Sequence, residues 1–182
     1  MKLYKLTDAK GWTRKKEYNA VCWEAGFKLE LPAISNPQLC TSNVVHAYIN
    51  PNLALLLNPI HAGINKPMLW LAEGEPCVTS WDKVGCFAIT TVKKLKLPAW
   101  YVDEAIRQKV QMQFAILCAE AVLHIYETAY PENNTSRKAI ETASAYLQNP
   151  TKENAEAARA AARTAARTAA VTANLRQHTV KS

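Results

Sequence analysis

The change of architecture in this chain falls within VGCFAITTVKKLKLPAWYVDEAI, residues 84–106. Residues 84–97 are rich in β-branched side chains, which is typical of a strand, and Pro98 ends the strand because proline has no N–H for the ladder. Beyond Pro98, apolar residues recur at three- and four-residue steps, the period of an amphipathic helix. The stretch predicts an α+β protein, with a β-rich N-terminal part followed by helices.

Upstream of this junction, several short segments alternate polar and apolar residues, and we expect a mainly antiparallel sheet. KLYKL at 2–6 is followed by the turn-forming TDAKG and the extended pattern of WTRKKEY, so a hairpin is predicted across Asp8 and Gly11. Arg14 lies just past this turn. LWLAEGE at 69–75 is a further strand candidate.

Downstream of Pro98, the apolar period predicts a long core helix with Asp103 and Glu104 in its first turn, where the helix dipole favours acids. Its stripe consists of Val102, Ile106, Val110, Phe114, Leu117, Ala121, Val122 and Ile125. Ser136 is expected to cap a second helix, which Asn149 and Pro150 end.

The tail, residues 151–177, is almost pure alanine after a Thr151 cap and predicts a long Ala-rich helix of about 25 residues, roughly 37 Å. Arg159, Arg163 and Arg167 recur every four residues and form a slanting basic stripe. The stripe either binds phosphate or a partner, or is a solvated face. Because alanine faces allow close helix approach, we expect packing on the preceding helix or a homo-oligomer.

These patterns predict three regions. Residues 1–98 form a β-rich domain, residues 99–149 form a helical part that packs on it, and residues 150–182 form an Ala/Arg-rich helix for packing or oligomerisation.

The composition narrows the functional classes. The formal charge of +7 favours anionic partners such as nucleotides, nucleic acid or an acidic protein. The chain has no apolar run near 18 residues and no signal-like N-terminus, which predicts a soluble cytoplasmic protein without a membrane span. Its five widely spaced cysteines indicate neither a disulfide framework nor a zinc ribbon, and we expect most of them to be buried thiols.

VVHAYINPNLALLLNPIHAG, residues 44–63, places two histidines and a tyrosine in an apolar run. A strand over 44–49 puts His46 and Tyr48 on one face, and Asn50 caps a short helix that Asn58 and Pro59 end. His61 then follows in a loop and can return toward that face. The polar-aromatic face is either a pocket wall or a half-exposed strand.

Motifs that would fix a reaction are absent from the sequence. His46 and His61 are 15 positions apart with no further ligand at metal-binding spacing, so no metal is expected. The chain has no nucleophile elbow, and its five glycines assemble neither a Walker loop nor a dinucleotide fingerprint. We therefore expect no cofactor.

The order of several segments along the chain is more informative about function than any single motif. The order LYKLTDAKGWTR, an isolated Leu39-Cys40, VHAYINPNLALLLNPIHA, LWLAEGE and KVGCFAITTVKKLKLP, followed by a helix and an Ala/Arg tail, resembles an uncharacterised domain common in bacteriophage and prophage proteins. The resemblance covers residues 1–125. It implies a phage accessory protein made in the host bacterial cytoplasm, a class that often acts against host defences, and it implies no reaction.

The strand order is also similar to small ADP-ribosyltransferase-like folds, which hold a nicotinamide nucleotide between two sheets. Such enzymes generally place a catalytic glutamate on a late strand, whereas TTVKKLKLP offers lysines there. Glu73 is the one carboxylate that would suit an enzyme. The resemblance thus implies binding without turnover.

Two hypotheses follow, with an ADP-ribosyltransferase-like enzyme as a weaker third. In the first, a phage counter-defence protein sequesters a nucleotide immune signal, either ADP-ribose-like or cyclic. Its ligand-binding residues divide into Arg14 and Lys83 for phosphate, Tyr48 and Trp70 for stacking, and His46, Asn58 and His61 for hydrogen bonds. In the second, a protein-binding inhibitor covers a host defence complex with the basic tail.

Overall fold

The computed structural model describes residues 1–13, 20–158 and 160–161 of the chain. The chain divides into two compact units, Met1–Val102 and Asp103–Ser182. The first unit contains antiparallel strands and the second contains helices, so the α+β prediction is confirmed. The packing of the helical part on the β-rich part stays a prediction, as does the role of the tail in oligomerisation.

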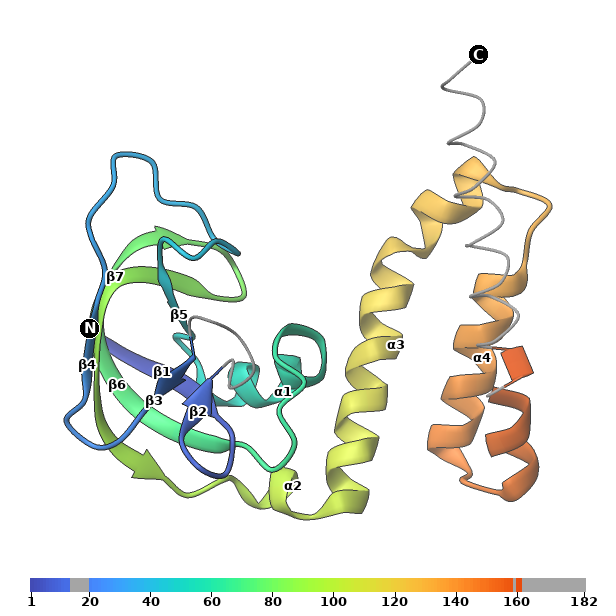
Figure 1. Cartoon of the computed structure of the whole chain (residues 1–182). Helices are drawn as coiled ribbons and strands as arrows, with labels where there is room; N and C mark the ends of the chain where they lie inside the picture. The colour runs from blue at the N-terminus through green and yellow to red at the C-terminus, as the bar shows by residue number, and fades with distance from the viewer. Residues whose placement is uncertain (14–19, 159, 162–182) are drawn as a thin grey trace. The chain divides into compact units, whose positions relative to one another are not determined.

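The first unit is organised around a five-stranded antiparallel sheet within its described residues, with strand order β1-β6-β7-β4 and β5 also paired to β7 (Figure 1). A separate two-stranded ladder joins β2 to β3. The strands are β1 (Lys2–Thr7), β2 (Trp12–Thr13), β3 (Val21–Cys22), β4 (Lys28–Glu30), β5 (Val45–Ala47), β6 (Met68–Thr79) and β7 (Val84–Leu95).

The predicted turn after β1 forms and is closed by the N–H of Asp8, which donates to the carbonyl of Trp12 at 2.8 Å, but no ladder between β1 and β2 is present among the described residues. Asp8 Oδ1 accepts hydrogen bonds from the N–H groups of Lys10 and Trp12, both at 2.8 Å. Beyond the turn, the N–H of Trp23 donates to the carbonyl of Gly11 at 2.7 Å, so β2 pairs with β3. The ladder of β1 is instead made with β6 along all six of its residues.

β6 and β7 are long strands that curl the sheet around the interior of the unit (Figure 1). The strand predicted at 69–75 continues to Thr79, and the ladder with β7 shifts register on both sides of Pro76. Such irregularities increase strand bend and accommodate a proline that cannot donate. Gly74 permits the tight curl, because a Cβ there would lie 2.8 Å from the carbonyl oxygen of Ala88.

The core of the first unit lies on the concave side of the sheet and is completed by β3 and β5. It consists of Leu3, Trp23, Val45, Ala47, Ala72, Val84, Cys86 and Ile89. Cys86 is thus a buried thiol as expected, but Cys22, Cys40 and Cys118 are exposed, so the prediction that most cysteines are buried is wrong. Two of these three lie in the first unit, in or beside short strands that leave one side open to solvent.

Helix α1 (Pro51–His61) begins as predicted, because Asn50 Oδ1 accepts from the N–H groups of Asn52 and Leu53. Its predicted end at Asn58 and Pro59 is wrong. Proline removes one helical hydrogen bond, yet the carbonyl of Asn58 still accepts from the next two residues past the helix, at 3.0 and 2.7 Å. His61 therefore lies in the last helical turn and not in a loop.

Past β7, α2 (Ala99–Val102) ends the first unit, and the second contains α3 (Glu104–Ala129) and α4 (Thr135–Gln148). Asp103 caps α3 through the N–H of Ile106. The prediction of a core helix is wrong for this unit, since Ile116 is the one buried side chain among its described residues. The physical reason is that α4 can cover only one side of α3.

The other predicted helix ends differ in one place. The N-cap of α4 is Asn134 and not Ser136, and Asn133 Oδ1 accepts the N–H of Thr135 at 3.0 Å. Asn149 is the C-cap as expected, and Thr151 Oγ1 caps the tail helix through the N–H of Asn154 at 3.1 Å. None of the helices in the described part of the chain has the length and apolar character needed to cross a membrane.

Candidate functional site

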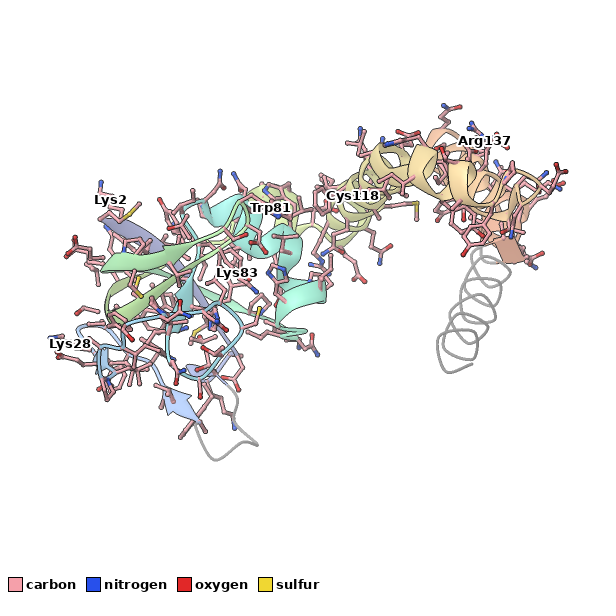
Figure 2. The ribbon with its side chains drawn as sticks, turned by 90° about the horizontal axis from the view of Figure 1, so that it is seen from above. Lys2, Lys28, Trp81, Lys83, Cys118 and Arg137 are labelled. Carbon is pink, nitrogen blue, oxygen red and sulfur yellow. The ribbon has the colours of Figure 1, made fainter. Side chains whose placement is uncertain are left out.

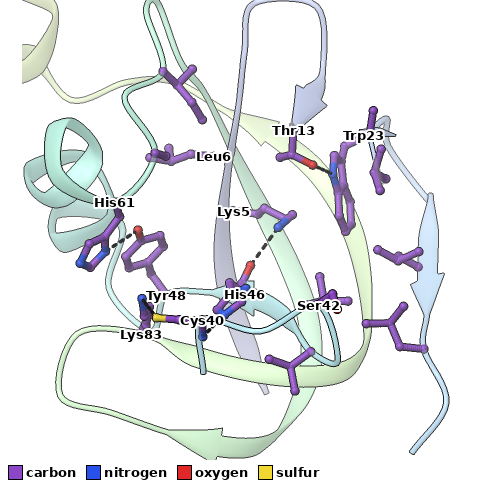
Figure 3. A pocket seen from close by; sticks show the side chains of 18 residues that line it. Lys5, Leu6, Thr13, Trp23, Cys40, Ser42, His46, Tyr48, His61 and Lys83 are labelled. Atoms are coloured by element: carbon purple, nitrogen blue, oxygen red, sulfur yellow. Dashed lines mark hydrogen bonds between the residues drawn. The ribbon is translucent and has the colours of Figure 1, made fainter. Parts of the chain in front are cut away.

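The first unit contains a cavity of about 680 Å³ between β1, β5, the end of α1 and the segment that precedes β5 (Figure 3). Polar and apolar side chains both line it. The polar lining consists of Lys5, Thr13, Cys40, Ser42, His46, Tyr48, His61 and Lys83, and the remaining lining of Leu6, Ala20, Val21, Trp23, Leu29, Leu31, Val44, Val45, Ala62 and Ile64.

Tyr48, His61 and Asp82 form a hydrogen-bonded series at one wall of this pocket. Tyr48 Oη lies 3.0 Å from His61 Nδ1, and His61 Nε2 lies 3.3 Å from Asp82 Oδ2. The two rings are also stacked, with centroids 6.1 Å apart. α1 supplies the histidine, and the β6–β7 loop supplies the carboxylate.

The electrostatics of the series fix the direction of its hydrogen bonds. Burial and the positive charge of Lys83 lower the pKa of His61, against the opposing attraction of Asp82. Burial and, secondly, the charge of Asp82 raise the pKa of Tyr48 to about 12. A neutral imidazole accepts at one nitrogen and donates at the other. Tyr48 therefore donates to His61, and His61 donates to Asp82.

A second cluster lies at the rim, where Cys40, His46 and Lys83 meet (Figure 3). Lys83 Nζ is 3.0 Å from Cys40 Sγ. The backbone N–H of Cys40 donates to His46 Nε2 at 2.9 Å, so this imidazole nitrogen is an acceptor. Cys40 has φ of 63°, a left-handed conformation that is uncommon outside glycine.

Lys5 places a second cation in the pocket wall. Its Nζ donates to the carbonyl of His46 at 2.9 Å and lies 4.5 Å from the ring centroid of Trp23, a cation-π contact. Trp23 Nε1 in turn donates to Thr13 Oγ1 at 2.9 Å. Lys5 is 9% exposed, so this ammonium is held inside the unit.

The structure brings four of the predicted ligand-binding residues together, namely His46, Tyr48, His61 and Lys83. Asn58 does not line the pocket. Its amide holds the loop after α1, donating to the carbonyl of Ile64 at 2.9 Å and accepting from the N–H of the same residue at 3.1 Å.

Trp70 also lies apart from the pocket lining. It is buried in β6, and its Nε1 donates to Thr7 Oγ1 at 3.0 Å. Glu73, the carboxylate considered for an enzyme, is exposed on the same strand and does not line the pocket. Arg14, Arg159, Arg163 and Arg167 lie outside the described residues.

The described residues contain no group of three histidine, cysteine, aspartate or glutamate side chains that could hold a metal ion.

Residues 103–180 match a family model described as "Imm-5 like putative immunity protein". The match covers the helical second unit and less than half of the chain, and it does not include the pocket. No curated protein and no solved structure matches the chain. The similarity of this immunity-family segment indicates an immunity- or defence-related role. The specific bacteriophage identity inferred from residues 1–125 stays a prediction.

Sequence reasoning missed Lys5, Trp23, Cys40 and Asp82 as residues of the site. Lys5 has a usable signal, because strand alternation places it on the same face of β1 as Leu3 and Thr7, both fully buried. The other three reach the site from the residue after β3, from an irregular segment and from the β6–β7 loop. No local pattern marks those contacts.

Proposed function

We propose that the first unit binds a small anionic ligand of the nucleotide type without turnover, and that this binding serves an immunity or defence role. The observation that carries the proposal is the charge of the pocket wall. Among the described lining residues, Lys5 and Lys83 are cationic and none is aspartate or glutamate. A cavity of about 680 Å³ falls within the roughly 300–1,000 Å³ typical of ligand sites.

The pocket lining offers groups for both parts of a nucleotide. Lys83, with a charged ammonium at the polar rim, would pair with a phosphate. The side chains of Val21, Leu29, Leu31 and Val44 offer an apolar surface for a base or a sugar face. Cyclic and ADP-ribose-like nucleotides combine these two chemistries.

The hydrogen-bonded series favours binding over catalysis. Tyr48 already donates its proton to His61, and a pKa of about 12 keeps the phenol neutral. His61 engages both ring nitrogens, one with Tyr48 and one with Asp82. The lone pair of His61 faces the phenol of Tyr48 and not the open pocket, and the raised pKa of Tyr48 makes that phenol a poor nucleophile.

Calorimetry with ADP-ribose, cyclic ADP-ribose isomers and cyclic dinucleotides tests the proposal. We expect at least one of these nucleotides to bind. Lys83→Gln should weaken the affinity for that nucleotide by about tenfold or more, because a charged hydrogen bond contributes about 1.5–3 kcal/mol. Lys28→Gln is the matched control, since Lys28 is exposed, pairs with Glu30 at 2.7 Å and does not line the pocket. Added salt should lower the affinity of the original protein.

Chromatography of the ligand after incubation completes this test. The proposal requires that the ligand is recovered unchanged. Failure of every nucleotide to bind, or recovery of an altered product, would contradict it.

The immunity-family match favours one second candidate, an inhibitor that binds a partner protein through the helical unit. The described side chains of Leu117, Val122 and Ile125 on α3 are exposed and apolar, and such side chains often mark protein-binding surfaces. The test is an assay in which production of this protein protects cells against a challenge. If the helical unit binds a partner protein, Leu117→Arg should abolish protection, whereas Lys83→Gln should leave protection intact. The nucleotide proposal expects the reverse.

A further inference from the structure

A nucleophilic thiol and an amine, those of Cys40 and Lys83, meet in the pocket lining. Their Sγ and Nζ atoms are 3.0 Å apart at the pocket rim, although the residues are 43 positions apart in the chain. Cys40 comes from the segment before β5, and Lys83, which is labelled in Figure 2, comes from the β6–β7 loop. Figure 3 shows the two side chains together. A bond between them would join two loops across the rim.

Both residues are held on fixed backbone. The N–H of Cys40 is bonded to His46 Nε2, and the left-handed φ of 63° aims its side chain from a defined turn. Lys83 closes the β6–β7 turn, because its carbonyl accepts the N–H of Ser80 at 2.9 Å. The fold thus places the two backbone segments so that the side chains can meet at the rim.

Cys40 is also reachable by a small oxidant, since it is exposed. Exposure is one requirement for oxidation of a cysteine, and the 3.0 Å contact with Lys83 Nζ places an amine beside the sulfur. Other cysteines of the first unit differ in surroundings. Cys22 Sγ faces the carbonyl of Lys10 at 3.8 Å, and Cys86 is buried, which raises its pKa to about 11 and keeps it a thiol.

We propose that Cys40 and Lys83 form a reversible covalent cross-link when the protein meets a peroxide. In the first step the Cys40 thiolate attacks a peroxide oxygen. An S–O bond forms, the O–O bond breaks, and hydroxide leaves and takes a proton to become water. The sulfur is oxidised by two electrons to sulfenic acid, and the peroxide is reduced.

In the second step Lys83, after its ammonium has lost a proton to solvent, attacks Sγ through Nζ. An N–S bond forms, the S–O bond breaks, and the hydroxyl leaves as water with the second amine proton. This condensation changes no oxidation state overall. In sum, one thiol, one amine and one hydrogen peroxide give one sulfenamide and two waters. Two equivalents of an added thiol reverse it, restoring Cys40 and Lys83 and forming the disulfide of the added thiol.

The cross-link would also act on the pocket, a consequence that rests on the proposed function. A sulfenamide nitrogen is not basic, so Lys83 loses the positive charge that pairs with the ligand phosphate. Oxidation should therefore weaken anion binding by about the same factor as Lys83→Gln, and thiol treatment should restore it.

Mass spectrometry of the full chain treated with hydrogen peroxide tests the cross-link without any ligand. We expect a product that has lost two hydrogen atoms, a joined pair of peptides containing residues 40 and 83, and return to the starting mass with dithiothreitol. Lys83→Arg keeps the charge but removes the amine, so it should instead gain one oxygen as the sulfenic acid. Cys118→Ser is the control with another exposed cysteine removed, and it should still form the cross-link.

Three results would overturn the inference: a disulfide in place of the joined pair, persistence of the product in Cys40→Ser, or oxidation of Cys40 to sulfinic acid with Lys83 unmodified. Failure of the cross-link is distinct from failure of the proposed function. If no cross-link forms but Lys83→Gln weakens nucleotide binding, the inference falls and the binding proposal stands. If the cross-link forms and no nucleotide binds, the reverse holds.

Discussion

The two units differ in how they bury apolar side chains. Of the 18 buried hydrophobic residues described, 17 lie in the first unit and Ile116 alone lies in the second. A curled sheet gives each of its inner side chains several strands and a helix as neighbours, whereas two helices share a single seam. The first unit therefore has a core of its own, whereas the described part of the second unit is stabilised mainly by helix propensity and by the contact between α3 and α4.

The largest expected effect comes from removing the same side chain in each unit. Leu55 in α1 is fully buried and Leu117 in α3 is 57% exposed. Leu55→Ala should lower the free energy of unfolding by about 2–5 kcal/mol, because it leaves a cavity, and Leu117→Ala should change it by less than about 0.5 kcal/mol. Equal losses in the two variants would remove the contrast between the units.

Urea unfolding read with two probes measures this. All five tryptophans lie within residues 1–102, so fluorescence reports the first unit. Far-ultraviolet circular dichroism reports mainly the long helices of the second.

A matched pair of asparagines gives the next effect. Asn58 is 4% exposed and forms hydrogen bonds with both backbone groups of Ile64. Asn154 in the tail helix is half-buried and donates to the carbonyl of Asn149. Asn58→Ala should lower the stability of the first unit by about 1–3 kcal/mol, because it leaves buried polar groups unpaired. Asn154→Ala should change stability by less than about 0.5 kcal/mol. Thermal melts of both variants test this. An unchanged melting temperature of Asn58→Ala would show that the loop after α1 does not need the hydrogen bonds from Asn58.

The pH dependence of the first unit follows from His61. Its pKa in the folded protein is lowered from the ordinary value of 6.5, so the unfolded chain binds a proton before the folded one does. The contribution of His61 to the free energy of unfolding is present in full above pH 6.5, and it is lost as the pH falls from 6.5 through the lowered pKa. Urea midpoints by tryptophan fluorescence should therefore decrease below pH 6.5, and less steeply in His61→Gln. An equal slope in that variant would mean that another group titrates.

The smallest effect is expected at the surface of the second unit. Arg137 makes two hydrogen bonds of 2.7 Å to the carboxylate of Glu127, but both side chains are partly exposed, at 51% and 32%. Exposed ion pairs add little to stability and are screened by salt. Arg137→Gln should lower the helical melting temperature slightly at low salt and not at high salt. A large loss in both conditions would show that this pair holds α3 to α4.

Much of the site could be anticipated where the pattern is local. Strand alternation placed His46 and Tyr48 on one face, and both line the pocket. The start of the helix after Asn50 is also predicted, but its end is not, because the carbonyl of Asn58 accepts from Ala62 and Gly63 and so the helix continues past Pro59. That continuation is what brings His61 to Tyr48 within a hydrogen bond.

Periodicity and capping patterns predict the class of fold, the long strands and the helix starts at Asn50 and Thr151, because they depend on residues a few positions apart. Asp103, which is expected in the first turn of α3, is its N-cap instead. The pairing of β1 with β6 is established by the tertiary structure alone. The same is true of the contacts that Asp82 makes with His61 of α1 and that Lys83 makes with Cys40 before β5. Those contacts join positions 21 to more than 60 residues apart. They form because the curled sheet buries its own apolar face, and no local pattern encodes which distant side chains that burial brings together.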